Sequence, residues 1–352
     1  MKDKILNEII ENTKKLMSYK TIKENYNEFI EAHKYIKEQL KDFYIEEYTI
    51  NNYQNLVISN TKDKHLDLIF CAHLDVVPAD SYEGKIVDDK LYGRGSIDMK
   101  GQLSVVISLL KNNKTNKKIA FIITSDEEIG GACCEEIMKN YTADLAVVPD
   151  ASSNFNVIIE EKGLLQIEVT AKGISHHASE PTKGENAILK LYDIYNEILK
   201  IYPIPKDDEY LPTVNLSKII GGKANNAVPD EATMTLDIRN NKEITHEEIL
   251  KNIKSISSVS SIKILNQGNI FQVDPNNPKI KDYLENANKI LKREVKLEKC
   301  HATSDGVYFS EKNIPTILTN PKGDYWHGPG EYVEIESLYT LYELFKTLLW
   351  YN

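Results

Sequence analysis

The sequence predicts an α/β protein in which a domain with a mostly parallel sheet is interrupted by a smaller, inserted α+β domain. Three observations lead to this prediction. Up to residue 163 and again after residue 275, continuous apolar runs alternate with amphipathic stretches, the pattern of a parallel sheet covered by helices on both faces. Between these parts, the stretches 164–173 and 231–240 alternate apolar and polar residues, which is typical of a sheet with one solvated face. The length of 352 residues accommodates two domains.

The larger domain is expected to comprise residues 1–163 and 276–352, which must come together to complete one sheet. Residues 1–21 have apolar side chains at helical spacing among charges, so an amphipathic helix is expected there rather than a signal peptide. Further strands are expected at 54–59, 66–72, 118–124, 144–148 and 314–319, and further helices at 26–42, 101–112, 278–292 and 335–350.

The inserted domain is expected to span residues 164–275. Its elements follow the order strand, helix, strand, strand, helix, strand, which is that of a small ferredoxin-like domain with one open sheet face. The strands that can be placed are 164–173, 231–240 and 261–268, and the helices are 185–200 and 246–257. Turn-forming residues at 274–280 close the insertion.

Composition and charge argue against several classes of partner. The net charge of −10 disfavours nucleic acid, which needs a basic stripe. No run approaches the roughly 20 apolar residues of a membrane span, so no membrane partner is expected and the protein is expected to be cytoplasmic. The four cysteines lack C-x-x-C spacing and are expected to be small buried residues. Three histidines in polar contexts, His33, His65 and His246, are expected to face solvent.

The stretch "IFCAHLDVV" ends an apolar strand on two polar residues, His73 and Asp75. Burying a polar group without a hydrogen bond costs roughly 2–7 kcal/mol, so both side chains need partners. The partner could be the other member of the pair, a backbone group or a metal ion. These two residues alone leave the alternatives open.

Further polar residues stand where other expected elements meet. Asp98 precedes an expected helix, the acidic run 126–128 follows an apolar strand, Asp150 ends another strand, and His327 lies among turn formers. Taken singly, Asp98 could be a helix cap and the acidic run a solvated face. Together with His73, they gather at the carboxyl ends of strands, where open α/β sheets bind ligands. Such nitrogen and oxygen donors suit two divalent ions, Zn²⁺ or in its place Mn²⁺ or Co²⁺.

At this point the sequence resembles the M20 metallopeptidases, which include dipeptidases, tripeptidase, carboxypeptidase G2, acetylornithine deacetylase and succinyl-diaminopimelate desuccinylase. The matching motifs are "HLDVVPA", "GRGSIDMKG", "DEEIGG", "GISHHASEPTKGENAI", "GGKANNAVPDEATMTLDIR" and "WHGPGEYV". They occur in the order of the family and extend from residue 73 to residue 333. The resemblance implies a zinc-peptidase catalytic domain with an inserted lid or dimerisation domain.

The resemblance also implies the ligands of two zinc ions. His73, Asp98 and Asp150 would bind the first ion. Glu128, His327 and the bridging Asp98 would bind the second. Cleavage would proceed by attack of a hydroxide held between the two ions.

Two further carboxylates have implied roles. Asp75 resembles the residue that orients the histidine ligand His73, which answers the question raised by that strand end. Glu127 resembles the general base that takes a proton from the attacking water and returns it to the leaving amine. The family commonly has a cis peptide after the bridging aspartate, so one is expected between Asp98 and Met99.

The motifs of the inserted domain imply contacts with substrate. The family motif reads His, any residue, a small residue, any residue, Pro. Counted back from the proline of "SHHASEP", this motif selects His177 and not His176. By resemblance, His177 would reach the active site of the partner subunit and stabilise the oxyanion. This role implies a homodimer formed through the inserted domains. Asn226 and Arg239 match positions that grip a substrate carboxylate, although Arg239 could also be an ordinary surface arginine. Asp305 matches a turn that lies near the substrate.

The substrate class depends on a smaller signal. Family deacylases usually have Glu at the position of Asp150, whereas peptidases that act on a free amino terminus more often have Asp. The segment "EEKG" at 160–163 also resembles the dipeptidase branch, so dipeptides or short peptides are expected as substrates. The chain length suits N-acyl-amino-acid deacylases equally well, and these remain the alternative. A non-catalytic binding relative is a remote alternative, because the five ligand positions and Glu127 are present.

Overall fold

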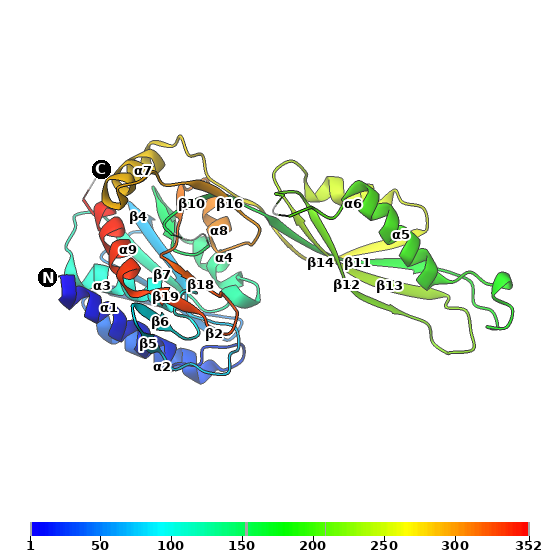
Figure 1. The fold of residues 1–352 in the computed structure, drawn as a ribbon, viewed down its shortest axis with the longest axis horizontal. Coiled ribbons are helices and arrows are strands. Elements are labelled where there is room, and N and C mark those ends of the chain that lie inside the picture. Colours follow the sequence, from blue (N-terminus) through cyan, green and yellow to red (C-terminus); the bar gives the residue numbers. More distant parts are fainter. Residues whose placement is uncertain (1, 152–153, 208, 351–352) are drawn as a thin grey trace. The chain divides into compact units, whose positions relative to one another are not determined.

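The computed structural model describes residues 2–151, 154–207 and 209–350. Its contacts divide the chain into two compact units (Figure 1). Unit 1 consists of Met1–Ile159, Gln272–Cys300 and Ser304–Asn352, and unit 2 of Glu160–Phe271 and His301–Thr303. The assignment of catalytic and lid roles to the two parts stays a prediction.

The large sheet confirms the predicted α/β class. In sheet order its strands are β1 (Tyr44–Ile50), β2 (Tyr53–Ser59), β7 (Ile119–Thr124), β4 (Leu68–His73), β9 (Ala146–Val148), β17 (Thr316–Leu318), β10 (Val157–Glu161) and β15 (Phe271–Gln272), with β16 (Leu297–Cys300) paired to β10. The central strands β7, β4, β9 and β17 are parallel, whereas β1, β2 and β10 pair antiparallel.

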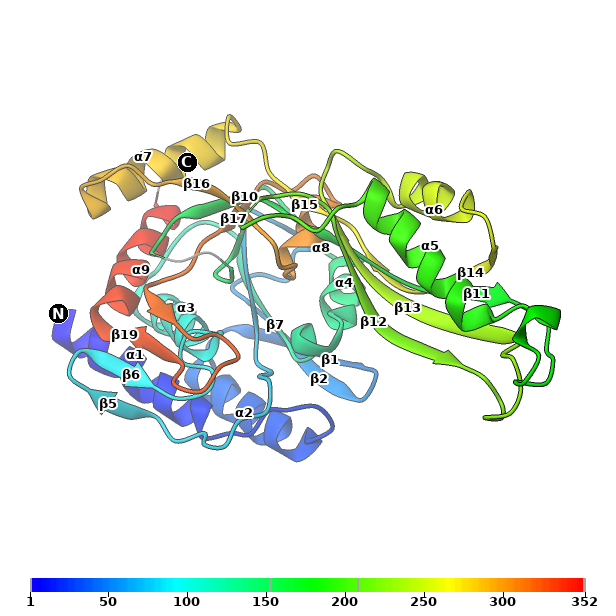
Figure 2. The ribbon, with the colours of Figure 1, turned by 45° about the vertical axis from the view of Figure 1, so that its right-hand side comes forward.

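Helices cover both faces of this sheet, as its continuous apolar strands require. Successive residues of β4 point to opposite faces: Phe70 packs on Phe345 of α9, and Cys71 lies 3.9 Å from Cys134 of α4, measured between the sulfur atoms. Figure 2 shows α1, α3 and α9 side by side, in contact with one another. The helices are α1 (Lys2–Met17), α2 (Tyr26–Gln39), α3 (Lys100–Asn112), α4 (Ala132–Met138), α7 (Pro278–Leu291), α8 (Gly306–Ser310) and α9 (Ile335–Leu348).

Two small sheets and one short helix complete unit 1. The strands β18 (Gly323–Asp324), β19 (Tyr332–Glu334), β6 (Lys90–Tyr92) and β5 (Lys85–Val87) form one sheet, β3 (His65–Leu66) pairs with β8 (Thr142–Ala143), and η1 spans Glu127–Ile129. The pairing of β6 with β19 joins segments that lie far apart in the sequence. Two candidate ligands, Asp98 and His327, are close to these paired segments in the chain.

Unit 2 is an antiparallel sheet with two helices packed on it. Its strand order is β12 (Thr213–Gly221), β13 (Glu231–Asn240), β11 (Gly163–Lys172) and β14 (Val259–Gly268). The two packed helices are α5 (Ala187–Ile201) and α6 (His246–Lys254), and a short 3-10 helix, η2, spans Pro181–Lys183. The apolar positions of β11 and β13 pack against α5 and α6 in one core. The other side chains of these strands are partly exposed, as the period of two predicts. The sequence ranges placed β11, β13 and β14 but not β12.

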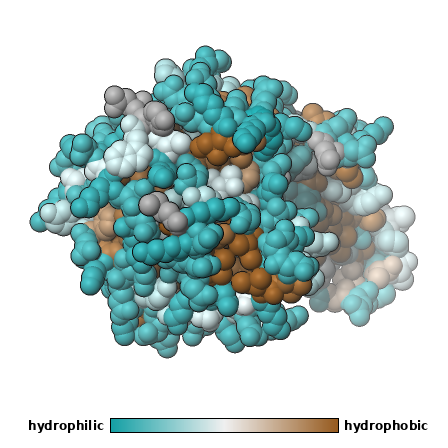
Figure 3. Space-filling model, turned by 60° about the vertical axis from the view of Figure 1, so that its left-hand side comes forward, coloured by the Kyte–Doolittle hydropathy of each residue, from teal (hydrophilic) through white to brown (hydrophobic). Residues whose placement is uncertain are grey.

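Within the described part of the chain, no helix has both the length and the apolar character that a membrane crossing requires. The face of the molecule drawn in Figure 3 is mainly hydrophilic, with hydrophobic residues gathered in small patches.

His33 contradicts the expectation that it faces solvent. The side chain is fully buried between α2 and the rest of unit 1, and neither ring nitrogen has a hydrogen-bond partner. Burial, together with Lys37, lowers the pKa of His33 from 6.5 to about 3. Its helix is polar overall, and the sequence did not show that His33 lies on the apolar side with Phe29 and Ile36.

This burial predicts destabilisation in acid. Because the pKa of His33 is lower in the folded state, the unfolded chain binds more protons below pH 6.5, and stability falls as the pH drops toward 3. We expect the unfolding free energy to fall by about 2 kcal/mol between pH 8 and pH 5 through this group. Urea unfolding in the presence of a chelator measures it. His33→Leu should remove this part of the pH dependence, whereas His65→Gln, at an exposed position, should retain it.

Candidate metal centre

The fold brings the predicted metal ligands to one edge of the large sheet. His73 is the last residue of β4, Glu127 and Glu128 follow the end of β7, and Asp150 follows β9. These three strands are neighbours and parallel, so their carboxyl ends meet. Asp98 precedes α3, and His327 lies in the loop between β18 and β19.

The ligands form two clusters that share one carboxylate. In the first, His73 Nε2 lies 3.0 Å from Asp98 Oδ1 and 4.0 Å from Asp150 Oδ2. In the second, His327 Nε2 lies 3.1 Å from Asp98 Oδ2 and 3.0 Å from Glu128 Oε2. Each oxygen of Asp98 therefore faces a different cluster. The peptide bond between Asp98 and Met99 is cis, as expected from the resemblance.

The donor atoms fit divalent ions. Ligand atoms that each lie 2.0–2.2 Å from a tetrahedral zinc ion are about 3.4 Å apart, and the observed separations of 3.0–4.0 Å bracket this value. Both clusters combine imidazole nitrogen with carboxylate oxygen, a donor set that suits zinc. The described residues therefore include two three-ligand groups joined by Asp98.

Charge in the centre also favours bound cations. Burial raises the pKa of Asp150 to about 6, with Asp98 adding to the effect. Burial acts to raise the pKa of Asp98 as well, but hydrogen bonds from His327 and His73 outweigh it and lower that pKa. His327 donates to the carboxylates of Asp98 and Glu128, and these hydrogen bonds raise its pKa to about 10. Partly buried carboxylates at such short range are stable together when positive charge lies between them.

Asp75 has more contacts than the sequence indicated. The Nδ1 atom of His73 lies 2.9 Å from the backbone oxygen of Asp75 and 3.5 Å from its carboxylate. The carboxylate itself accepts hydrogen bonds from the backbone N–H groups of Glu127, at 3.3 Å, and Glu128, at 2.9 Å. Asp75 therefore orients the imidazole so that Nε2 faces the ligands, and it also holds the backbone of two acidic residues.

Glu127 is placed beside the clusters but belongs to neither of them. It is partly buried, and burial raises its pKa well above the ordinary value. The adjacent Asp126 points elsewhere: its carboxylate accepts the backbone N–H of Cys133 at the start of α4. In the acidic run, Glu128 is thus a cluster member, Glu127 lies outside both clusters, and Asp126 binds the first turn of α4.

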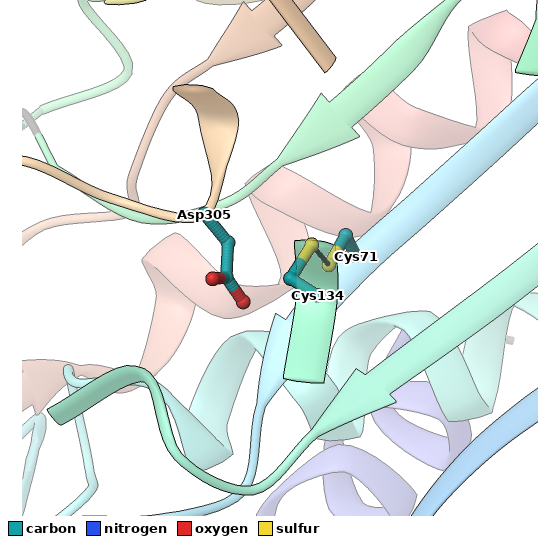
Figure 4. Close-up of side chains that lie close together, drawn as sticks. All are labelled: Cys71, Cys134 and Asp305. Atoms are coloured by element: carbon teal, nitrogen blue, oxygen red, sulfur yellow. Dashed lines mark hydrogen bonds between the residues drawn. The ribbon is translucent and has the colours of Figure 1, made fainter. Parts of the chain in front are cut away.

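Asp305 lies in the interior instead of lining an open surface. It is 3% exposed and accepts a hydrogen bond from Thr124 Oγ1 at 2.8 Å. Figure 4 shows its carboxylate beside Cys71 and Cys134, which are buried as the sequence predicted. Cys133 is buried as well, whereas Cys300 is only partly buried, contrary to the prediction. Burial raises the pKa of Asp305 to about 8 and that of the Cys134 thiol well above its ordinary value. Protonated thiols are poor ligands, so we interpret this group as interior packing. A substrate role for Asp305 stays a prediction.

A cavity adjoins the second cluster. It has a volume of about 490 Å³ and is lined by the segments 78–85, 92–94 and 327–331. A larger cavity of about 750 Å³ is lined by residues that include Ile119, the first residue of β7. The ligands follow the last residue of this strand, so the larger cavity is remote from them. The smaller cavity is therefore a space beside the second cluster that a ligand could enter.

The predicted substrate residues of unit 2 lie at two ends of its sheet. His177 forms a β-bridge with Ala227, and the backbone N–H of Ala178 donates to Asn226, so His177 and Asn226 are neighbours. Both are exposed, whereas His176 lies 3.4 Å from Glu180. Arg239 is near the far end of β13, opposite Leu164, and donates to Asp237 at 2.9 Å. The structure groups His177 with Asn226 but not with Arg239.

Comparison with known proteins agrees with this geometry. Residues 69–351 match the model of the peptidase family M20/M25/M40. The chain belongs to this family. The resemblance inferred from the motifs is thereby confirmed, and the protein is a metal-dependent M20 hydrolase.

M20 relatives by name include both peptidases and deacylases. Succinyl-diaminopimelate desuccinylase of Sulfurovum sp. is 25% identical over 319 residues, which cover 85% of this chain and 87% of that protein. A LysW-lysine/LysW-ornithine hydrolase of Sulfurisphaera tokodaii is 30% identical over 253 residues, 70% of each chain. The structure of aminopeptidase PepT from Bacillus cereus has a TM-score of 0.79 at 18% identity and covers 98% of both chains. This last likeness shows a shared M20 fold.

Proposed function

We propose that this M20 hydrolase uses two divalent ions to cleave the amide bond next to an amino acid with a free carboxylate, with dipeptides or short peptides as the favoured substrates. The observation that carries the proposal is the pair of ligand clusters joined by Asp98, with Glu127 beside them. His73, Asp98 and Asp150 would hold one ion, and Asp98, Glu128 and His327 the other. Zn²⁺ suits the donors best, and Mn²⁺ or Co²⁺ could replace it.

The residues of the chain have separate tasks in this proposal. When bound, two such ions polarise a carbonyl group and lower the pKa of nearby water. Glu127, which is not a cluster member, takes a proton from the attacking water and returns it to the leaving amine. Asp75 keeps His73 in the correct tautomer and fixes the backbone that carries Glu127.

Distances within unit 2 support a dimeric active unit. Arg239 is separated from the loop that carries His177 and Asn226 by eight residues of β13, or about 27 Å. A dipeptide spans only about 7 Å, so these groups can contact the same substrate only if they come from two copies of the chain. The edge strand β12 exposes Ile220, which is 69% accessible, in line with pairing between copies.

Mixed dimers test this arrangement. Neither His177→Ala nor Glu127→Gln homodimers should be active, but dimers with one chain of each kind should contain one complete site. Co-expression in equal amounts should therefore restore about a quarter of wild-type activity. Activity in the His177→Ala homodimer, or no recovery in the mixture, would contradict a role of His177 in the partner's site.

A deacylase of N-acyl amino acids is the second candidate, because the relatives named above include a succinyl-diaminopimelate desuccinylase. The side chain of Asp150 favours the peptidase. It is one carbon shorter than Glu and leaves room for a substrate ammonium group, to which its carboxylate can contribute charge.

A release assay with added Zn²⁺, Mn²⁺ or Co²⁺ distinguishes the two functions. Unblocked dipeptides are compared with N-acetyl and N-succinyl amino acids, and Glu127→Ala serves as the blank. Cleavage of the dipeptides alone would support the peptidase. Cleavage of the acylated amino acids alone would establish the deacylase, and cleavage of neither would refute the proposal.

A further inference from the structure

A buried ion pair that has no part in the proposed chemistry lies next to the metal centre. Arg94 follows β6 and is 5% exposed, and Glu331 precedes β19 and is 2% exposed. The Nη1 atom of Arg94 donates to Glu331 Oε2. Arg94 is one of only three arginines in the chain, and a rare residue type in a buried position points to a specific requirement for its shape and charge.

Further hydrogen bonds join this pair to the backbone of the segments that carry Asp98 and His327. Glu331 Oε1 accepts hydrogen bonds from the backbone N–H groups of Ile97, at 3.1 Å, and Asp98, at 3.3 Å. Arg94 Nη2 donates to the backbone oxygen of His327 at 2.9 Å. One ion pair thus connects the shared ligand Asp98 with the only described ligand of the loop between β18 and β19.

The His327 loop needs such an anchor. The side chain of His327 is 56% exposed, so packing does not hold it in place. Its backbone has a φ of +59°, in the left-handed region that side chains other than glycine rarely adopt. A hydrogen bond to the backbone oxygen of this residue opposes relaxation to a more common conformation.

Stability alone does not explain the pair. Burying two charges carries a large desolvation cost that their attraction offsets only in part, so a buried ion pair is weak evidence of a stabilising role. Each partner here instead makes a hydrogen bond with the backbone of a metal ligand. A planar guanidinium can serve both acceptors at once, which a lysine ammonium cannot do with the same geometry.

We propose that Arg94 and Glu331 are positioning residues of the metal centre. They hold Asp98 and His327 at the separation that lets Asp98, Glu128 and His327 bind one ion. This inference rests on the proposed two-metal function, and it adds residues that touch neither ion nor substrate.

Zinc binding tests the proposal without reference to catalysis. Competition with a chromophoric chelator gives the affinity of the full chain for each Zn²⁺ ion. Arg94→Lys keeps the charge opposite Glu331 but loses the contact with His327, and Glu331→Gln removes the charge. Either change should lower the affinity for one of the two ions by about 10–100-fold, the usual effect of losing a residue that supports a ligand. Glu334→Gln, in the exposed pair with Lys322 at 3.9 Å, is the matched control and should bind both ions normally.

The result can be separated from a loss of fold and from a failure of the proposed function. Unfolding midpoints are measured in chelator, so that a purely structural role would lower the midpoint and leave both affinities of the folded chain unchanged. Unchanged affinities in Arg94→Lys would overturn the inference, even if Glu331→Gln does not fold. A wild-type chain that binds fewer than two ions would instead refute the two-metal function itself.

Discussion

Glu127→Gln is expected to lower kcat by about 10²–10⁴-fold, the contribution typical of a general base. The substitution keeps the size of the side chain but removes the atom that accepts a proton. Glu127 belongs to neither ligand cluster, so both ions should still bind. Steady-state kinetics on the best substrate of the release assay, combined with zinc analysis of the same sample, measures the two effects separately.

Glu135→Gln is the matched control for this change. Glu135 is an exposed residue of α4, eight positions along the chain, and its substitution should leave kcat unchanged. If Glu127→Gln retained full activity with two bound ions, Glu127 would not be the base. If it lost an ion, its role would be that of a ligand.

Asp98→Asn is expected to have the largest effect on metal binding. Asp98 is the only described residue that belongs to both clusters, with one oxygen facing each. Asparagine has the same shape but offers one oxygen and no charge, so it cannot bridge two ions. We expect a loss of zinc affinity at both positions beyond the about 10–100-fold that follows from losing a supporting residue. Activity should fall to the background of the assay.

His327→Gln separates the bridging role from that of an ordinary ligand. His327 contacts only the second cluster, so this variant should retain one ion, whereas Asp98→Asn should retain neither at zinc concentrations that saturate the wild type. Asp282→Asn, at an exposed position of α7, controls for the loss of a negative charge. Loss of a single ion in Asp98→Asn would show that Asp98 does not bridge.

The metal ligands could be predicted from the sequence because polar side chains stand where the neighbouring residues predict a buried, apolar environment. An apolar strand that ends in His73, or three acids directly after the buried strand β7, has no inexpensive explanation within its own element. The strands and helices could also be predicted from local patterns. A continuous apolar run indicates a strand buried on both faces, and alternation indicates a strand buried on one face. Fold class and candidate ligands could therefore be predicted from these local patterns, and the family from the motifs that resemble it.

Other features depend on groups that lie far apart in the chain. Nothing near Asp75 in the sequence indicates that its carboxylate accepts a hydrogen bond from the backbone N–H of Glu127, 52 residues away. His33 stands in a polar helix, and only the packing of α2 shows that it is buried. The pair of Arg94 and Glu331 spans 237 residues. Such contacts are set by how strands and loops meet in space, which periodicity does not report.

The residue types available for metal chemistry, and the elements in which they lie, follow from local features of the chain. Their joint arrangement follows from the folded chain: Asp98 faces two clusters, Asp305 is interior, and His177 and Arg239 lie at opposite ends of a sheet. The physical reason is that the identity of a ligand is a property of one side chain, whereas a metal centre is a set of distances. Those distances are imposed by strand register and by hydrogen bonds to the backbone.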